Sequence, residues 1–471
     1  MKKLRHYITT IAIACFVTAC SSDSYPGLEY EYDTTSTSNT EEGTVEDLGV
    51  QVKVFISEQG FYTASALNET KGTGPFVVPD TTVADHNHYE KSIFRLFAFR
   101  NRRDEQGPYS EHPDYTKRSN VDKVDCLIDG PIFEYGMPAH LGSDHAGELL
   151  IKAKETQMIR PDLMNDTVIY YNSRFEDYGY RFFAYYLDDA IITNARRESS
   201  RIHYDIEIDG TQDIMVGQSQ KLTSEVLNKR HNTVSLTSEQ RNRINWIGCY
   251  GSYSSSLGIY PIVDLKHMLA RIQFLAYPAD ESCSLVYIDS VSINSKYRGE
   301  ITVAAHNSAE IGMTFKKDRK WFHLMQRPNP KGLNSDSLGI YPLVDLNSNE
   351  NHLEWDNTMS KTDWRQNKHI ILGSDMLVPK DSVYSITLHY HQKVKENEIN
   401  IPEDRKFKFE TTLSAPHIDA NYDEATNSWC FMPGKIYYVP IRIYGLKKID
   451  VDVDLNMWED DGNVNIDNDA P

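Results

Sequence analysis

The chain has 471 residues, of which 40% are hydrophobic and 11% aromatic, and its formal net charge is −19. An acidic excess of this size argues against nucleic acid as a partner and against electrostatic docking on an anionic lipid surface. The length corresponds to about two to three ordinary domains. The sequence therefore predicts a multidomain protein that binds neither nucleic acid nor a membrane surface through its charge.

The first twenty residues predict export. Three basic residues occur within the first five, an apolar run follows over 8–17, and Cys20 comes directly after a small residue. This is the pattern of a lipoprotein signal peptide, 1–19, whose removal leaves Cys20 as the acylated N-terminus. The apolar run is too short to cross a bilayer as a permanent helix. An ordinary secretory peptide with a chance cysteine is the alternative.

The chain after the signal peptide divides into four predicted parts. Residues 20–46 are rich in Ser, Thr, Asp and Glu, which indicates a solvated tether. We predict an N-terminal β-sandwich over 47–221, a helical junction over 222–255 and a C-terminal β-sandwich over 256–471. Cleavage of the signal peptide removes three basic residues and no acid, so the formal net charge of the mature chain becomes −22.

The first predicted strand is read from a strict alternation. Leu48, Val50, Val52, Val54 and Ile56 are separated by single residues that are mostly glycine or polar. Successive side chains of a strand point to opposite faces, so this run has one apolar face. We expect that face to be buried in the first sandwich.

Further strand-like runs are separated by charged or Gly- and Pro-containing loops. They lie at 92–100, 124–128, 149–153, 167–171, 181–187 and 201–208 in the first half, and at 284–293, 300–304, 311–315, 383–390 and 406–413 in the second. The run 265–277 fits a helix or a strand, and its β-branched end and the following Pro278 favour a strand.

Helical signals are confined to the stretches 223–229 and 237–246. Thr237 is the expected N-cap of the second stretch, and Gln240 stands at the position that completes a capping box. Because strand-length runs dominate on both sides of these stretches, we predict an all-β fold. It consists of two β-sandwiches in tandem with a short helical insert near their junction.

The chain closes on a predicted hairpin over 433–458. Apolar residues occupy every second position over 449–457, and Asp or Asn occupies the positions between them. Residues 436–444 form a second run rich in β-branched and aromatic residues, and Gly445 supplies the turn. The pattern predicts two antiparallel strands with one buried and one solvated face.

One short sequence occurs twice. Residues 256–265 read SLGIYPIVDL and residues 337–346 read SLGIYPLVDL, so that only Ile262 and Leu343 differ. The similarity stops on both sides, which excludes a repeat of a whole domain. We interpret it as a local duplication of a strand and a turn, and we assign it no function.

Motifs that are typical of catalysis or of metal binding are absent or incomplete in this sequence. The sequence has no GxSxG, HExxH or Walker motif, so we predict no enzyme and no cofactor. His389 and His391 would share a strand face but have no identifiable third ligand. Asp450, Asp452 and Asp454 lack the glycine of a calcium loop and alternate with apolar residues. We predict no metal site.

Aromatic residues leave a second function open. Trp321, Trp355, Trp364 and Trp429 could stack on sugar rings, whereas most aromatics of β-sandwiches form core and cross-strand contacts. A surface glycan-binding lipoprotein is therefore the alternative to a structural protein.

The cysteines after the signal peptide and Cys20 are widely spaced, with no CxxC pair. They are Cys126, Cys249, Cys283 and Cys430. Export would allow disulfides, and sparse buried thiols are equally compatible with the spacing. Both interpretations stay open from the sequence.

Several stretches resemble the fimbrillin family, the Mfa-like pilins of type V pili. They are FFAYYLDD (182–189), IEIDGTQDIMVG (206–217), DLKHMLARIQF (264–274) and the closing hairpin (433–458), in the family's order and after a lipobox. The resemblance implies two transthyretin-like β-sandwiches and an outer-membrane lipoprotein exposed at the cell surface. It also implies assembly with other fimbrillin subunits into fibres that adhere to a host or bacterial surface ligand.

The resemblance also implies assembly by strand complementation, in which a strand from a neighbour fills a groove. In the family the first strand occupies that groove until a protease cuts after it, typically behind an arginine. The matching strand here is 48–56, and no arginine occurs between Ile56 and Arg95. We therefore predict that the first strand stays in place and that the chain is an accessory or anchor subunit.

Overall fold

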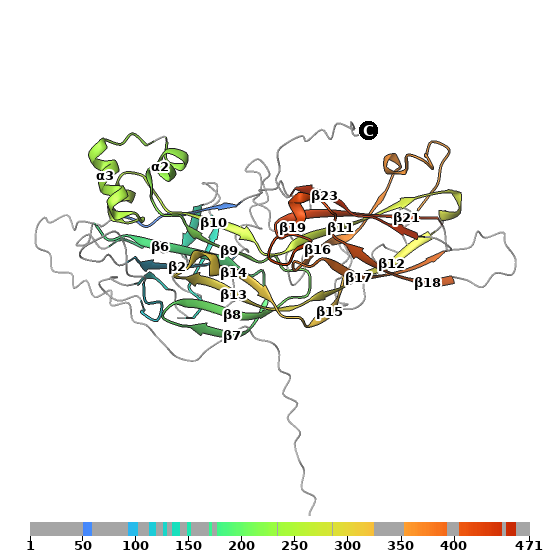
Figure 1. Ribbon diagram of the computed structural model, residues 1–471, viewed down its shortest axis with the longest axis horizontal. Coiled ribbons are helices and arrows are strands. Elements are labelled where there is room, and N and C mark those ends of the chain that lie inside the picture. Colours follow the sequence, from blue (N-terminus) through green and yellow to red (C-terminus); the bar gives the residue numbers. More distant parts are fainter. Residues whose placement is uncertain are drawn as a thin grey trace, which may run out of the picture.

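In the computed structural model, β-strands are the main secondary structure of the described residues (Figure 1). Two groups of strands lie side by side along the long axis, with the helices at the end of the first group. The predicted all-β class and the short helical insert are confirmed. The structure describes residues 50–58, 93–101, 113–118, 126–129, 134–141, 148–151, 169–171, 177–232, 234–284, 286–324, 353–392, 405–444 and 449–457. The signal peptide, Cys20 and the tether lie outside these ranges.

The largest sheet closes on itself. Its strands are β1 (Val54–Glu58), β2 (Phe94–Arg100), β3 (Cys126–Ile128), β4 (Met137–Leu141), β5 (Glu148–Ile151), β6 (Tyr180–Tyr186), β9 (Met215–Ser219) and β10 (Ile262–His267). Their order is β3-β2-β4-β5-β1-β10-β9-β6, and β6 also pairs with β2. Seven strands, β2-β4-β5-β1-β10-β9-β6, thus form a ring that we call the closed sheet. Closure pairs strand edges that would otherwise be open.

A four-stranded sheet packs against the outside of the closed sheet. Its strands, in chain order, are β7 (Ile191–Arg197), β8 (Arg201–Glu207), β13 (Arg298–Ala305) and β14 (Gly312–Phe315). Strands β2 and β6 are buried on both faces because Phe97 and Phe183 contact this second sheet, whereas Leu96 and Phe182 point into the closed sheet. This double burial explains the continuous apolar runs in both strands.

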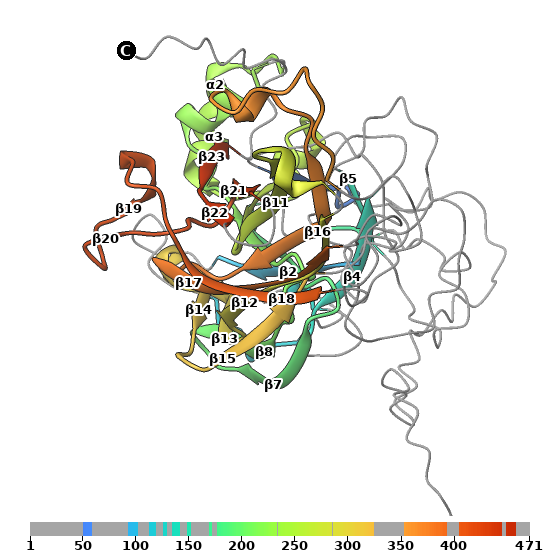
Figure 2. The ribbon, with the colours of Figure 1, turned by 90° about the vertical axis from the view of Figure 1, so that its right-hand side faces the viewer.

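The second group of strands forms a sandwich of two sheets. One sheet contains β11 (Ala270–Pro278), β16 (Ile370–Val378), β21 (Lys435–Ile443), β22 (Ile449–Val451) and β23 (Asp454–Met457). The other contains β12 (Val286–Lys296), β15 (Arg319–His323), β17 (Val383–Gln392) and β18 (Arg405–Ser414). A small hairpin of β19 (Tyr422–Asp423) and β20 (Ser428–Trp429) extends from this sandwich (Figure 2).

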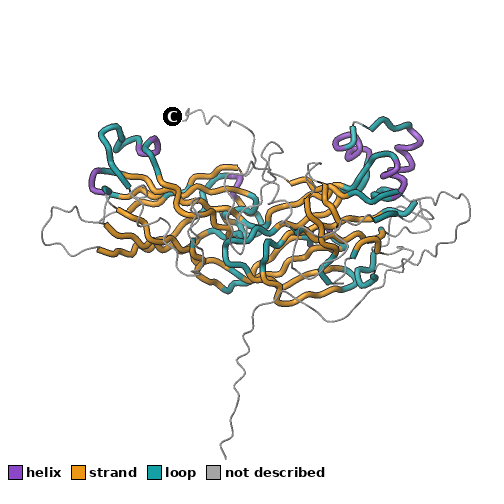
Figure 3. Tube along the Cα trace, turned by 180° about the vertical axis from the view of Figure 1, so that it is seen from behind, coloured by secondary structure: helices purple, strands orange, loops and turns teal. Residues whose placement is uncertain are grey.

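Three helices, α2 (Ser224–Arg230), α3 (Ser238–Ile247) and α4 (Ser252–Ser256), lie together beside the closed sheet (Figure 3). The predicted capping box of α3 is present, with Thr237 accepting from the Gln240 backbone and the Gln240 side chain accepting from the Thr237 backbone. Four short 3-10 turns complete the helical content of the described residues: η3 (Glu281–Cys283), η4 (Ser308–Glu310), η5 (Trp364–Gln366) and η6 (Asp419–Asn421).

The predicted closing hairpin is confirmed, with one interruption. Strands β22 and β23 both pair antiparallel with β21 in a single register. The break falls at Asp452, whose backbone N–H donates to the carbonyl of Pro440. Proline has no backbone N–H and cannot donate a second hydrogen bond to Asp452, so the ladder of backbone hydrogen bonds is interrupted at this pair. The predicted turn at Gly445 lies outside the described residues.

The ambiguous run 265–277 contains two strands. The end of β10 and most of β11 occupy it, separated at Met268 and Leu269. Of the predicted strand at 167–171, the described part makes one bridge, between Gln51 and Tyr170. Strands β4, β7, β9, β15, β16, β19 and β20 were not predicted.

The order of strands in the sheets does not follow the order of the chain. Strands β10 and β13 come after residue 256, yet β10 pairs with β1 and β9, and β13 pairs with β8, all of which come before residue 222. The proposed division into 47–221, 222–255 and 256–471 stays a prediction, and these pairings cross it.

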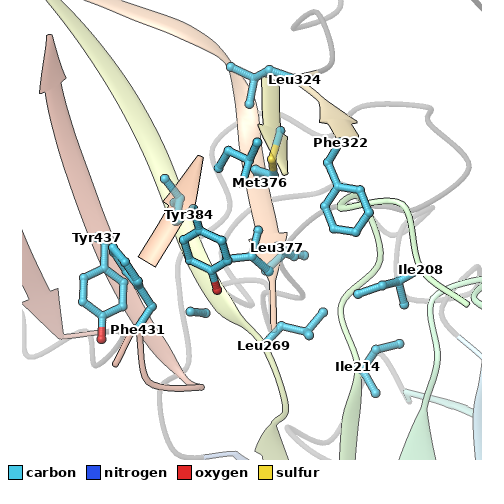
Figure 4. Close-up of a cluster of buried hydrophobic side chains, with 14 of the residues drawn as sticks. Ile208, Ile214, Leu269, Phe322, Leu324, Met376, Leu377, Tyr384, Phe431 and Tyr437 are labelled. Atoms are coloured by element: carbon cyan, nitrogen blue, oxygen red, sulfur yellow. The ribbon is translucent and has the colours of Figure 1, made fainter. Parts of the chain in front are cut away.

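A continuous apolar cluster joins the two groups of strands (Figure 4). Ile208 and Ile214 face Phe322 and Leu377 across the junction. Gly210 lies at φ +97°, and a Cβ there would come within 2.9 Å of the Phe322 ring. Glycine adopts that backbone conformation without strain and leaves room for the ring. Its carbonyl accepts from the Leu377 N–H at 2.8 Å, which fixes the junction.

Candidate functional site: the first strand in the closed sheet

Strand β1 has partners from its own chain on both edges. On one side it runs parallel to β10, with Phe55 opposite Ile262. On the other it runs antiparallel to β5, with Val54 opposite Leu149. Just upstream, the Val52 N–H donates to the carbonyl of Ile169 at 2.7 Å. The backbone groups of the first strand are therefore hydrogen-bonded within the protein itself.

The side chains of this strand alternate as the sequence predicts. Val52, Val54 and Ile56 are 4%, 0% and 5% exposed and lie inside the closed sheet. Val50 is half-buried, and Leu48 lies outside the described residues. Fully burying one such side chain contributes about 1.5–3 kcal/mol, so removing the strand would cost on the order of 5 kcal/mol before its backbone is counted. The role of these five residues as a groove-filling strand stays a prediction.

Strand β10 is the parallel neighbour of β1. Val263 and Leu265 are 0% and 1% exposed inside the closed sheet. Asp264 points the other way, where Arg230 Nη1 and Gln220 Nε2 each donate to its carboxylate at 2.6 Å. Charge-assisted bonds of this kind are the stronger ones, so α2 and the end of β9 hold β10 in register.

Backbones of β9 and β10 approach closely at Gly217. A Cβ on this glycine would lie 2.0 Å from the carbonyl oxygen of Asp264. No side chain fits at that distance, so glycine is required for β10 to occupy its place.

The helical insert closes one end of the closed sheet. Leu227 of α2 and Ile244 of α3 are each 1% exposed and belong to the same interior cluster as Val54 and Val263. The insert therefore completes the core around the first strand.

A second feature is an exposed aromatic cluster on the β19–β20 hairpin, made of His417, Tyr422 and Trp429. The His417 and Trp429 rings stack with centroids 4.2 Å apart, and Tyr422 meets Trp429 edge-on at 5.6 Å. Tyr422 and Trp429 are 40% and 36% exposed. Asp423 pairs with Lys380 at 2.8 Å, which anchors the hairpin. The cluster is thus a fixed, partly exposed aromatic surface.

The other predicted tryptophans differ in environment. Trp321 on β15 is 40% exposed, Trp355 packs against the core, and Trp364 contacts the Tyr277 ring and the Arg442 guanidinium. They lie on separate elements and form no row with Trp429 among the described residues.

The histidine pair on β17 is separated by environment. His389 is exposed, whereas His391 is buried, stacks on Tyr287 and lies 2.7 Å from the Asp289 carboxylate. Within the described ranges, no three His, Cys, Asp or Glu side chains gather as a metal site. Asp450 pairs with Arg442, and Asp452 with Arg365.

All four described cysteines are buried free thiols, so neither disulfide nor exposed thiol chemistry applies to them. They are Cys126, Cys249, Cys283 and Cys430. Burial raises the pKa of Cys249 and of Cys283 to about 11. A thiol with such a pKa is unreactive at neutral pH. The sequence left this question open, and the structure answers it.

Lipidation at Cys20 is outside the described residues and stays a prediction. Of the helices that the structure describes, none combines the length and apolar character needed to traverse a bilayer.

Sequence reasoning predicted strands at 149–153 and 265–277, which overlap β5 and the end of β10, but it paired neither of them with β1. Strand β5 is short, and β10 is separated from β1 by about 200 residues, so no local pattern connects them. The duplicated SLGIYP sequence, interpreted as a strand and a turn, also includes the start of β10. The fold and this site together define an all-β protein whose first strand is completed by its own chain.

Comparisons with known proteins add structural similarities. No model of a known protein family matches the sequence, and no curated protein matches it significantly. One similar solved structure is a Bacteroides uniformis protein assigned provisionally to cell adhesion, with a TM-score of 0.36 and 11% identity over 88% of this chain and 100% of that one. Another is the fimbrial anchor protein Mfa2 from Porphyromonas gingivalis, with a TM-score of 0.30 and 11% identity over 87% and 98%.

A third similar structure is the tip fimbrial protein Mfa3 from Porphyromonas gingivalis, with a C-terminal truncation. Its TM-score is 0.30, with 8% identity over 87% of this chain and 100% of that one. These similar structures are thus described as cell adhesion and fimbrial proteins.

Proposed function

We propose that this protein is a structural and adhesive subunit of type V-like fimbriae, held in the outer membrane by acylated Cys20. It performs no reaction. Its partners are other fimbrillin subunits, and its exposed surface contacts a host or bacterial ligand. The fimbrillin-like stretches of the sequence and the lipobox support this proposal.

The observation that carries the proposal furthest is the pairing of β1. Both edges of this strand are bonded by β5 and β10, and its apolar side chains fill the closed sheet. A subunit whose first strand is held in this way presents no empty groove at that position. Because no arginine occurs between Ile56 and Arg95, where the family is typically cut, we infer that the first strand is retained and that the protein is an accessory or anchor subunit rather than a stalk subunit activated by cleavage.

N-terminal sequencing of the surface-exposed form tests this role. We expect a chain that begins at lipidated Cys20 and is blocked to sequencing until the lipid is removed. The variant Cys20→Ala provides the matched control, because it should leave the fold intact and release the protein from the membrane fraction. A surface form that begins near residues 60–75 would show that the first strand is cut away and would overturn the anchor role.

Glycan binding is the second candidate, and the aromatic cluster of His417, Tyr422 and Trp429 favours it. Exposed, rigidly held rings provide the flat apolar faces on which sugars stack. Retention of the protein on polysaccharide gels would support this candidate if Trp429→Ala abolished it. The control is Trp321→Ala, which removes an exposed tryptophan elsewhere on the surface.

A further inference from the structure

The structure shows the role of one copy of the duplicated sequence. Residues 256–265, SLGIYPIVDL, run from the last residue of α4 into β10, which lies between β1 and β9. We call the place between these two strands the β10 position. Residues 337–346, SLGIYPLVDL, lie outside the described ranges, so only their sequence is compared.

The apolar contacts that hold the first copy are all matched in the second. Ile259, Val263 and Leu265 are 0%, 0% and 1% exposed inside the closed sheet. Their counterparts are the same residue types at the same spacing: Ile340, Val344 and Leu346. The second copy therefore carries the apolar pattern that the β10 position requires.

The polar and conformational features are also matched. Gly258 lies at φ +79°, a conformation that favours glycine, and Gly339 is its counterpart. The Asp264 carboxylate accepts from Arg230 and Gln220. Asp345 supplies the same group in the second copy.

The one difference between the two copies lies at a position that is not fully buried. Ile262 is half-exposed, and it lies opposite Phe55 on the outer side of β1. Leu343 replaces it in the second copy with a side chain of the same volume, a kind of exchange that proteins tolerate well. Every position that is fully buried inside the closed sheet is identical.

We propose that segment 337–346 of one molecule takes the β10 position of a second copy of this protein, displacing segment 256–265 of the recipient. This deepens the proposed function, on which it rests, by naming a donor strand and an acceptor position. Each chain carries two copies of the sequence and one β10 position, so the number of filled positions is unchanged by exchange.

Contacts in the β10 position are nearly the same before and after exchange. The equilibrium between separate and exchanged molecules therefore depends on the effective concentration of the protein. A lipid anchor holds copies on one surface and raises their effective concentration, which favours exchange between molecules. Weakening segment 256–265 in the recipient should favour it further, and weakening segment 337–346 in the donor should oppose it.

Cysteine capture between two different variants tests the proposal. The chain from residue 20, carrying Cys20→Ala, is prepared with either Phe55→Cys or Leu343→Cys, and the two proteins are mixed under oxidising conditions. Exchange places residue 343 of the donor opposite residue 55 of the recipient, because residue 262 lies there now. We expect a disulfide-linked heterodimer on a non-reducing gel. The four native cysteines are buried and do not compete.

Two controls fix the register and the geometry. Replacing Leu343→Cys by Val344→Cys turns the thiol to the interior face, so the heterodimer should fall at least tenfold. The double variant Phe55→Cys/Ile262→Cys should close within one chain, which reports β10 in its own position. Absence of the heterodimer while this reference closes would overturn the proposal, as would equal capture by both donor variants.

Reciprocal variants give a second readout that needs no added cysteine. Leu265→Ala weakens only the displaced segment, so it should raise the dimer fraction severalfold in sedimentation, whereas Leu346→Ala weakens only the donor and should lower it. A dimer fraction that responds to neither variant would overturn exchange through this segment. That outcome would leave the lipid anchor and the retained first strand untouched, because both are measured on the cell surface.

Discussion

The two groups of strands manage their sheet edges in opposite ways. In the first group, seven strands pair around a ring and enclose a core of their own. In the second, among the described residues, β18 pairs with β17 alone and β16 with β11 alone, so each sheet ends on a strand bonded on one side. Open edges accept further strands, and closed sheets accept one only by exchange. A neighbour can therefore add at an open edge of the sandwich, or at β7 or β14 of the four-stranded sheet, whereas it can enter the ring only by replacing a strand.

The largest expected effect separates the interior of the ring from the exposed surface of the sandwich. Val54→Asp buries a carboxylate at a position that is 0% exposed, and we expect it to cost more than about 4 kcal/mol of unfolding free energy. Val383→Asp, at a position 40% exposed on β17, should change it by about 0.5 kcal/mol or less. Chemical denaturation measures both. Similar losses for the two variants would refute the contrast.

The same contrast exists within the sandwich. Phe431 is 0% exposed and packs edge-on against the Tyr437 ring, so Phe431→Ala should cost about 3–5 kcal/mol. Trp429, two residues earlier, is 36% exposed, and Trp429→Ala should cost about 1 kcal/mol or less. Thermal unfolding of both variants decides the matter. A large loss for Trp429→Ala would mean that the aromatic cluster is structural rather than a surface for ligands.

A smaller effect measures how far the helical insert supports the ring. Thr237→Ala removes the hydroxyl oxygen that accepts from the Gln240 backbone N–H in the α3 capping box, and it should cost about 1 kcal/mol of unfolding free energy. Asn307 caps the short η4 turn outside the insert, and Asn307→Ala should cost less. The two denaturation midpoints are compared directly. Equal changes would indicate that the insert folds independently of the core that it covers.

The smallest effect concerns pH. Burial, and secondarily Arg230, lower the pKa of His231 at the end of α2. The folded state therefore binds this proton less readily than the unfolded state, so the stability contribution is full above the unfolded pKa of about 6.5 and declines as pH falls below it. His231→Gln should lose less stability than the parent between neutral and mildly acidic pH in denaturation series. A parallel loss in both proteins would contradict this assignment.

Local alternation accounts for what the sequence predicted. Strands β2, β6, β8, β12 and β17 are long, and each carries apolar residues that match a buried face. Strand β7 was not predicted because its residues, IITNARR, are largely exposed and show no buried apolar face. Strand β9, MVGQS, is short and contains the glycine that its neighbour requires. Edge strands and close backbone approaches leave little periodic signal.

Pairing over long distances could not be predicted at all. Nothing in residues 48–56 specifies a parallel partner at 262, and nothing near Thr302 specifies that β13 returns to β8. The aromatic cluster was predicted only through Trp429, because His417 and Tyr422 join it by the folding of a hairpin. The spacing of the four cysteines in the sequence was compatible with disulfides and with free thiols, and only the structure, in which all four are buried and unbonded, distinguished these two interpretations.

The parallel pairing of β1 with β10 has a consequence for the order of synthesis. A chain that is made from its N-terminus presents residue 55 about 200 residues before residue 262. Until then the earliest hydrophobic strand of the mature protein has no place to dock on that edge. Because the partner strand is made late, the hydrophobic side chains of β1 stay exposed for longer, and exposed hydrophobic segments make newly made chains prone to aggregation. The ring can therefore close only after the middle of the chain has been made, in whatever order its other strands form.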